Sequence, residues 1–285
     1  MRKILTTIIK PISITLLSLF MLIACGKDDG TKPIKILYPS WSESVAIMYL
    51  ADEALTQNGF TVEKSLVEPG PLFAAVAQGS ADLYLTSWLP NTHRDYWERF
   101  GDQLDIISVI FDGGVSGFAV PQYVNINSIE ELNDHVEMFD GKIYGDGAGA
   151  GIHALTLQAI EDYELDYEQI GSSEASMLAE LRRAISAKEP VIITSWKPHY
   201  MWDLYELKML EDPKVIYPTD EITILSRKGF SDDQPEVTHF LKNFKLDSEK
   251  LHELIGMARK DERNPQVGVK EFYQKYKTEI DSWFP

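Results

Sequence analysis

Apolar positions in the first part of the chain alternate between strand spacing and helix spacing. Residues 34–38, 60–67 and 83–86 are short apolar runs typical of strands. Residues 43–58 and 72–78 carry apolar side chains at helical spacing, and each of these segments stops at a glycine, which favours a helix C-cap. This order predicts an α/β fold with a mostly parallel sheet flanked by helices, and such sheets bind ligands at the carboxyl ends of their strands.

A similar order restarts after Pro121. Ser128 and Glu131 have the spacing of a capping box, which marks a helix start. The pattern predicts a helix over 128–139, a strand over 142–144, helices over 152–163 and 175–187, and a strand over 191–194. The last third is predicted to be helical over 234–244 and 248–283, with breaks at Pro265 and Gly268.

Two segments repeat one short motif. Residues 85–97 read LTSWLPNTHRDYW and residues 193–202 read ITSWKPHYMW, so each has Thr-Ser-Trp, one residue, Pro, and a histidine close behind. Both lie at the carboxyl end of a predicted strand. We therefore expect two similar lobes that present matching loops to one cleft, and the alternative is a chance similarity between two loops.

Three tryptophans come directly after predicted strands, namely Trp41, Trp88 and Trp196. Core packing is the alternative use of such residues, but three at one topological position favour a binding surface. A quaternary ammonium group has no N–H to donate, and the negative face of an indole ring attracts its charge, with about 0.5–2 kcal/mol per contact. A sugar site or an enzyme would need a cluster of polar groups that the pattern lacks. Trp97, Trp202 and Trp283 fall in helical patterns and are assigned to packing.

A glycine-rich segment, YGDGAGAGIH over residues 144–153, lies between a predicted strand and a predicted helix. Glycines let backbone N–H groups approach a ligand, and a helix N-terminus favours an anion. Residues 145–150 also fit GxGxxA, a weak dinucleotide signal that is not favoured in an exported chain. A small carboxylate at Gly151 and Ile152 is the preferred interpretation, and a tight turn without a ligand is the alternative.

The N-terminus has the pattern of an export signal. Arg2 and Lys3 precede a long apolar run that ends at Ala24, which predicts a signal peptide over residues 1–24. Leu-Ile-Ala-Cys at 22–25 resembles a bacterial lipobox, so Cys25 is predicted to be lipidated, with residues 25–33 as a flexible tether. An uncleaved membrane helix is the alternative, although the run is short for a span.

Composition excludes several functions. Cys25 is the only cysteine, so neither an internal disulfide nor a cysteine-based metal site can form. The formal charge is −17, which argues against a nucleic acid partner and against peripheral binding to anionic lipid.

The spacing of the histidines predicts no metal site. His199 follows the second Trp-x-Pro motif and is assigned to packing, although it could support that loop.

Taken together, these motifs make the chain resemble the glycine betaine and proline betaine substrate-binding proteins of ABC transporters, the OpuAC-like family. The segments that carry the resemblance are the Trp41 loop, EPGPLFAAVAQGSAD (68–82), SWLPNTHRDY (87–96), GDGAGAGI (145–152), ITSWKPHYMW (193–202) and ITILSRKGF (222–230). The resemblance extends over nearly all of the chain after the tether. Family turns often carry Pro or Ser where this chain has Gly147 and Ala150, which puts ligand affinity in question more than ligand class.

The resemblance implies a two-lobed periplasmic-binding-protein fold of the type II kind, with the ligand in the cleft between the lobes. The implied lobe I spans 34–118 plus 222–285, and lobe II spans 119–221. The implied trimethylammonium cage is Trp41, Trp88 and Trp196. The implied carboxylate ligands are the backbone amides of Gly151 and Ile152 and the side chain of His93.

The implied function is capture of a small zwitterion, glycine betaine or proline betaine, for osmoprotective uptake. Its implied partners are a permease and an ATPase subunit. We expect a monomeric, non-enzymatic receptor without cofactor or metal, lipid-anchored on the extracytoplasmic face of the cell membrane. A choline or carnitine receptor of the same fold is the alternative. Choline has no carboxylate, so that alternative predicts an idle Gly151 turn and an acidic residue near the cage.

Overall fold

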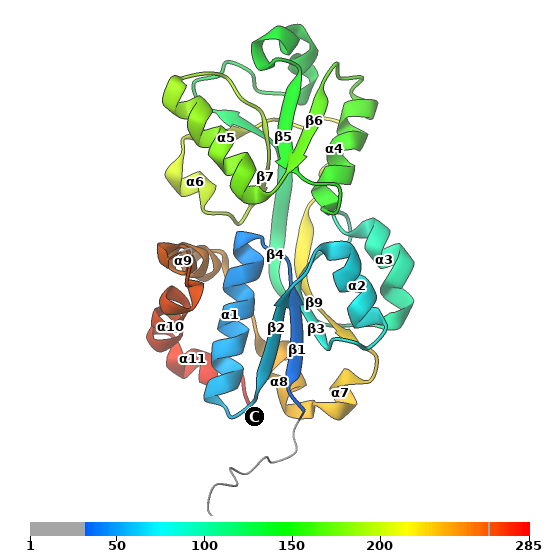
Figure 1. Ribbon diagram of the computed structural model, residues 1–285, viewed down its shortest axis with the longest axis vertical. Helices are drawn as coiled ribbons and strands as arrows, with labels where there is room; N and C mark the ends of the chain where they lie inside the picture. Colours follow the sequence, from blue (N-terminus) through cyan, green and yellow to red (C-terminus); the bar gives the residue numbers. More distant parts are fainter. Residues whose placement is uncertain (1–31, 262) are drawn as a thin grey trace, which may run out of the picture. The chain divides into compact units, whose positions relative to one another are not determined.

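The computed structural model describes residues 32–261 and 263–285, of which Pro33–Pro285 forms one structural unit. The predicted signal peptide, Cys25 and most of the predicted tether lie outside the described residues. The strands of the described part form a single sheet in the order β2-β1-β3-β9-β4-β7-β5-β6, with β8 paired to β4. Helices cover the sheet, so the α/β class predicted from the sequence is confirmed (Figure 1).

The first strand group forms in the predicted order. The strands are β1 (Ile34–Tyr38), β2 (Val62–Leu66) and β3 (Leu83–Leu89), and β1 pairs in parallel with both of the others. The connecting helices are α1 (Ser42–Gln57) and α2 (Pro69–Ala77). α1 is buried along most of its length because it lies between the sheet and two C-terminal helices, which explains its apolar side chains on several faces.

The second strand group consists of β5 (Lys142–Asp146), β6 (Glu168–Ser172), β7 (Ile193–Lys197) and the short β8 (Leu207–Met209). Here β5 pairs in parallel with β6 and β7. The helices of this part are α4 (Gly151–Asp162), α5 (Glu174–Ala187) and α6 (Met201–Leu204). The segment Ile129–Phe139 forms the predicted helix with its capping box at Ser128, but as a 3-10 helix, η2, kinked at His135.

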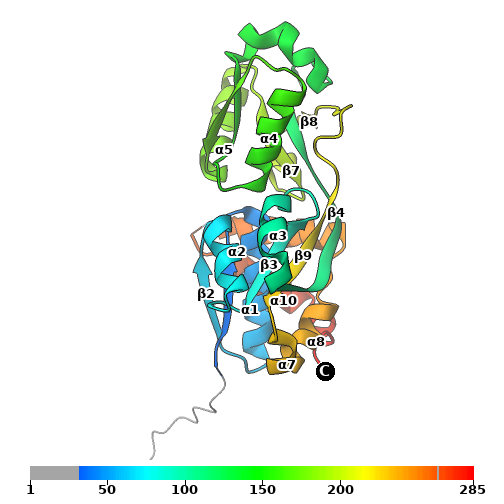
Figure 2. The same ribbon diagram turned by 90° about the vertical axis from the view of Figure 1, so that its right-hand side faces the viewer.

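Two long antiparallel strands join the groups and make the sheet mixed. β4 (Leu104–Pro121) pairs with β9 (Asp220–Arg227) through its first part and with β7 through Val115–Ala119. Figure 2 shows β4 continuing from one group into the other. The sequence pattern did not predict these strands, because glycines and three register shifts against β9 interrupt the alternation along β4.

Both tryptophan motifs end differently from the prediction. β3 and β7 continue through Trp88 and Trp196, so these residues lie within strands and not directly after them. Backbone pairing explains the extension, because Trp88 is opposite Ile222 of β9 and Trp196 is opposite Ser116 of β4. In each motif the peptide bond before the proline is cis.

The connection after β3 and the C-terminal third are helical. α3 spans Arg94–Phe100, and η1 (Gly101–Gln103) follows it. The C-terminal elements are α7 (Phe230–Asp233), α8 (Pro235–Asn243), α9 (Ser248–Ala258), η3 (Arg259–Asp261), α10 (Pro265–Lys275) and α11 (Lys277–Asp281).

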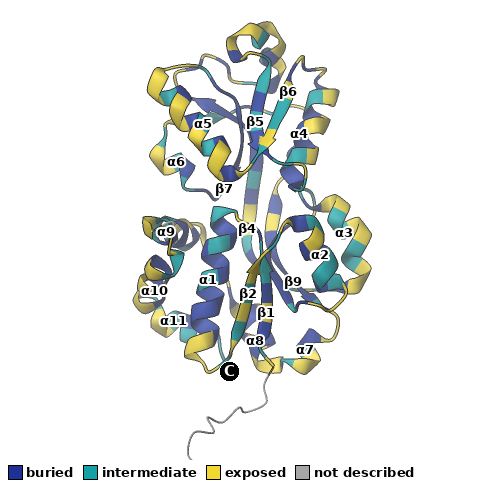
Figure 3. Ribbon diagram, viewed as in Figure 1, coloured by how far each residue is buried: buried dark blue, intermediate teal, exposed yellow. Residues whose placement is uncertain are grey.

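One of the two predicted helix breaks is wrong. Pro265 is the first residue of α10, where a proline is tolerated, but Gly268 lies inside that helix. A Cβ at Gly268 would lie 1.8 Å from the carbonyl oxygen of Met257, so the glycine lets α10 pack closely on α9. Figure 3 shows buried residues along the inner strands and along the helix faces turned toward them, with exposed residues on the outer helix faces and on the edge strands β2 and β6.

Candidate functional site

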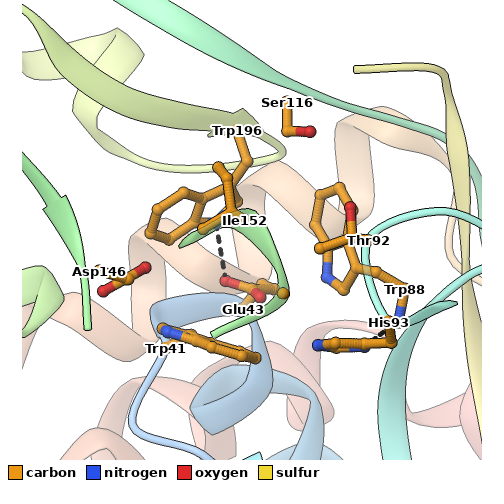
Figure 4. Close-up of a pocket in the computed structure, with 10 residues that line it drawn as sticks. Trp41, Glu43, Trp88, Thr92, His93, Ser116, Asp146, Ile152 and Trp196 are labelled. Carbon is orange, nitrogen blue, oxygen red and sulfur yellow. Dashed lines mark hydrogen bonds between the residues drawn. The ribbon is translucent and has the colours of Figure 1, made fainter. Parts of the chain in front are cut away.

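A cavity lies where the two strand groups meet (Figure 4). The empty space in it measures about 320 Å³, part of which is open to solvent. Its lining consists of Trp41, Glu43, Trp88, Thr92, His93, Ser116, Asp146, Gly151, Ile152 and Trp196. All six residues predicted from the sequence to contact a ligand are in this set. Their individual roles remain predictions.

Trp41 occupies the turn between β1 and α1. It is the N-cap residue of α1 and has an extended backbone, which turns the chain from the strand into the helix. Its ring is partly buried and stacks on the ring of His93 at a centroid distance of 5.9 Å and an interplanar angle of 19°. Trp41 is therefore held beside the Trp88 motif, although the two segments are far apart in the sequence.

Trp88 is buried at the end of β3, and a glycine on β4 leaves room for its ring. A Cβ on Gly114 would lie 2.8 Å from that ring, so β4 can pass this close only without a side chain. Trp196 is buried at the end of β7 in the corresponding position. Its carbonyl oxygen accepts a hydrogen bond of 2.9 Å from Nε1 of Trp202. Trp202 therefore supports the end of β7 at Trp196, in addition to the packing role predicted for it.

His93 presents a hydrogen-bond donor to the cavity. Its Nδ1 accepts a hydrogen bond of 2.8 Å from the backbone N–H of Trp88, and burial lowers the pKa of His93 to about 3. The ring is therefore neutral, and its proton lies on Nε2. Nε2 is buried and has no acceptor among the residues that the structure describes. A buried donor without a partner in a cavity is well suited to an anionic ligand group.

Gly151 and Ile152 are the first two residues of α4, so their N–H groups have no acceptor in a preceding helical turn. Gly151 touches the loop of the first Trp-x-Pro motif. A Cβ at Gly151 would lie 1.9 Å from the carbonyl oxygen of Thr92. That loop is held in place by Asp220, whose carboxylate accepts hydrogen bonds from the backbone N–H groups of Asn91 and Thr92 and from the Thr92 hydroxyl.

Two acidic residues in the cavity were not predicted from the sequence. Glu43 is 1% exposed and accepts a hydrogen bond of 3.1 Å from Nε1 of Trp196. Asp146 is 3% exposed and lies at the end of β5. Burial raises the pKa of Glu43 to about 8 and the pKa of Asp146 to about 7, and the charge of Glu174 adds to both effects. Glu43 could have been identified as a site residue from the sequence, because it lies two residues after Trp41.

His199 has a role beyond packing. Its ring contacts the Trp196 ring edge-on at a centroid distance of 4.8 Å, and its Nδ1 accepts a hydrogen bond of 2.8 Å from the backbone N–H of Met201. The proton therefore lies on Nε2, which donates to Glu174 at 3.0 Å. Glu174 also accepts a hydrogen bond from the backbone N–H of Ser42, so it links the Trp196 loop to the start of α1.

Trp97 and Trp283 lie outside the lining of the cavity. Trp283 stacks on Phe244 at a centroid distance of 5.1 Å, as expected for a packing residue. Trp97 is partly buried beside α2 and η1, in the smaller of the two apolar clusters.

Within 32–261 and 263–285, no group of three or more His, Cys, Asp or Glu side chains is arranged to hold a metal ion. None of the helices in that part of the chain is both long and apolar enough to span a bilayer.

Known proteins resemble the chain in both sequence and structure. The model of the OpuAC family, described as the substrate-binding domain of ABC-type glycine betaine transport systems, matches residues 32–275. The glycine betaine/carnitine transport binding protein GbuC of Listeria monocytogenes is 34% identical over 151 residues. That match spans 52% of this chain and 50% of the Listeria protein.

Solved structures match over a larger share of the chain. Lactococcal OpuAC, in its closed conformation with glycine betaine, is 29% identical with a TM-score of 0.85, covering 90% of this chain and 100% of that chain. The glycine betaine, L-proline-binding protein ProX of Borrelia burgdorferi is 29% identical with a TM-score of 0.86, covering 89% and 97%. These neighbours are two-lobed periplasmic binding proteins.

Proposed function

Because the chain belongs to the OpuAC family of substrate-binding domains of ABC-type glycine betaine transport systems, we propose that it captures glycine betaine outside the cytoplasm and delivers it to a transporter of this kind. The observation that carries the proposal is the cavity itself, where three tryptophans meet the first two residues of α4 and His93 Nε2, which has no partner among the described residues. The ligand is released unchanged, so the proposal includes no catalysed step.

The three tryptophans suit the cationic end of glycine betaine. A trimethylammonium group cannot donate a hydrogen bond, so recognition must come from shape and from the attraction of aromatic faces. Trp41, Trp88 and Trp196 line the cavity from the β1–α1 turn, β3 and β7. At about 0.5–2 kcal/mol per contact, three such contacts contribute about 1.5–6 kcal/mol. Micromolar binding, about 8 kcal/mol, therefore also needs the contacts to the carboxylate end.

The donors suit the carboxylate end. His93 Nε2 carries a proton and has no partner among the described residues, and the N–H groups of Gly151 and Ile152 begin a helix. A helix N-terminus stabilises an anion through its free N–H groups and its dipole. All three residues line the cavity that contains the tryptophans. A ligand with both charges on a short chain therefore matches the two kinds of group.

We propose that residues 34–118 plus 222–285 form lobe I and residues 119–221 form lobe II. Hydrogen bonds between these segments support a closed arrangement. Trp196 donates to Glu43, the Ser42 N–H donates to Glu174, and the Tyr96 hydroxyl donates to the Gly149 carbonyl at 2.8 Å. Since neither lobe carries the whole site, a ligand is expected to shift the population toward the closed form.

We also propose that Cys25 carries the lipid anchor and that the protein acts as a monomer beside its permease and ATPase subunits. The lipobox-like sequence at residues 22–25 supports this proposal. The charge of −17 supports it as well, because an acidic chain needs an acyl chain to hold it at an anionic membrane. Membrane attachment would keep the receptor near the permease. The signal peptide over residues 1–24 is part of the same proposal.

A receptor for choline or carnitine is the second candidate. The acidic residue that this alternative predicts near the cage is present, because Glu43 and Asp146 both line the cavity. A protein carboxylate could compensate the charge of choline, which brings no carboxylate of its own. With choline, the carboxylate-binding donors would then have no ligand group to meet, and leaving His93 Nε2 without a partner is costly.

A calorimetric titration with glycine betaine, proline betaine, carnitine and choline distinguishes the candidates. We expect glycine betaine or proline betaine to bind most tightly and choline to bind much more weakly, because choline leaves the three donors unpaired. Choline binding as tight as glycine betaine binding would favour the second candidate. Failure of all four ligands to bind would contradict both.

A further inference from the structure

Two carboxyl groups line the cavity without a role in the proposed recognition of glycine betaine. Glu43 comes from α1 and Asp146 from the end of β5. An aromatic cage needs no carboxylate to attract a methylated ammonium, since the ring faces supply the attraction. Figure 4 shows the Glu43 carboxyl group near the rings of Trp41 and Trp196, and Asp146 on another side of the same space.

The surroundings of these two acids contain negative charge and neutral rings. Glu174 on α5 accepts hydrogen bonds from the Ser42 N–H and from His199 Nε2, and it acts on both acids through its charge. Glu68, the N-cap residue of α2, acts on Asp146 as well. The titratable groups facing the pair from the surrounding elements are Glu68, Tyr84, His93, Glu174 and His199. Along the described lining of the cavity there is no lysine or arginine.

Burial without a counter-cation keeps protons on these acids. Burial, followed by the charge of Glu174, raises the pKa of Glu43 to about 8. Burial, followed by the charges of Glu174 and Glu68, raises the pKa of Asp146 to about 7, against a lowering by a hydrogen bond from Trp41. At neutral pH the cavity without ligand therefore holds at least one proton on the pair.

We propose that Glu43 and Asp146 determine the charge specificity of the cavity: they hold an exchangeable proton in the empty cage, and a permanently cationic ligand replaces that proton. The proposal rests on the proposed function, because it takes a quaternary ammonium as the ligand. The ligand is not altered, and the released proton passes to the solvent. At neutral pH the cage then carries its full negative charge only when a positive charge is inside it.

The two carboxyl groups determine how the affinity for the ligand changes with pH. A fixed positive charge near a carboxyl group favours its ionised form, so the ligand lowers the pKa of the pair and binding releases a proton. Affinity for a quaternary ammonium therefore rises with pH and levels off above about pH 8, once the empty cage has lost its protons. Below about pH 7 the loss of affinity approaches about tenfold per pH unit for each proton released.

An isostere of the ligand that lacks the positive charge separates charge from shape. In 3,3-dimethylbutanoate a carbon atom replaces the ammonium nitrogen, so the methyl groups and the carboxylate are kept and the positive charge is lost. This compound cannot replace the proton, and ionised Glu43 and Asp146 disfavour burying it without compensation. Its affinity is expected to fall as the pH rises, opposite to that of glycine betaine.

Calorimetry of the full-length protein in detergent at pH 6, 7, 8 and 9 measures how the affinity depends on pH. Titrations at pH 7 in phosphate and in Tris measure the protons released. We expect about half to one proton per glycine betaine at pH 7, from the difference in heat between the two buffers. Glu43→Gln and Asp146→Asn are each expected to release fewer protons and to flatten the pH dependence. Asp134→Asn, an exposed residue on η2, is the charge-matched control and is expected to match the unmodified protein.

Three outcomes are informative. Tight glycine betaine binding with no proton release, or with equal release in all variants, would overturn the inference and leave the proposed function standing. The same pH dependence for the isostere as for glycine betaine would also overturn it. No binding of glycine betaine at any pH would overturn the proposed function, and the inference with it.

Discussion

Replacing Gly151 with alanine is expected to weaken glycine betaine binding by about 10- to 150-fold, and the contact with Thr92 supplies the reason. The added Cβ would lie 1.9 Å from the Thr92 carbonyl oxygen, whereas ordinary contact begins at 3.4 Å. The two backbones must therefore separate by about 1.5 Å before the closed arrangement can form.

The structure shows what this separation costs. Thr92 donates its N–H and its hydroxyl to Asp220 Oδ2 at 3.0 and 2.6 Å, so the loop cannot retreat without losing a hydrogen bond to a charged group. One such bond contributes about 1.5–3 kcal/mol, which corresponds to the expected loss of affinity. If α4 retreats instead, the N–H groups of Gly151 and Ile152 move away from the ligand carboxylate.

Calorimetric titration with glycine betaine measures the effect, and the melting temperature without ligand checks that the variant folds. Gly149→Ala is the matched control in the same turn, because its Cβ would have its nearest neighbour at 3.8 Å and meets no clash. We expect the control to bind like the unmodified protein. A Gly151→Ala variant that also binds within about twofold of the unmodified protein would refute the reasoning from this contact.

Two further predictions test the cage and the anchor. Trp88→Ala and Trp196→Ala are each expected to weaken glycine betaine binding at least about tenfold, about 1.4 kcal/mol, because each removes one aromatic wall; calorimetry showing unchanged affinity in both variants would contradict the cage. Cys25→Ser is expected to move the protein from the membrane fraction to the soluble fraction on centrifugation, because the lipid can no longer be attached; continued membrane association would mean that the apolar segment itself is the anchor.

Local patterns in the sequence were sufficient for much of the architecture. The order from β1 to β3, the capping box at Ser128 and the helix after the glycine-rich turn follow from apolar spacing, caps and glycines, which act within a few residues. The repeated Trp-x-Pro motif pointed to two equivalent strand ends. The six candidate ligand contacts line one cavity because β3 and β7 run in opposite directions and both end at the same part of β4, where Trp88 lies against Gly114 and Trp196 pairs with Ser116.

Other features depend on contacts that no local pattern contains. The lengths of β3, β4, β7 and β9 follow from pairing between distant segments, so the expected strand ends were too early and the long antiparallel strands were not predicted. Gly268 has the local appearance of a helix break, but its neighbour across the helix pair is Met257, and close packing explains it instead.

By itself, the sequence determined the α/β class, the two tryptophan motifs, the glycine-rich helix start and the family to which these belong. Only the tertiary structure decided which groups share the cavity. Glu43 and Trp196 lie 153 positions apart and are joined by a hydrogen bond, and the pKa of Glu43 is raised because folding buries it near Glu174. Burial and charge are properties of the whole set of neighbours, so a carboxylate that looks like an ordinary helix residue becomes part of the site only when the chain is folded.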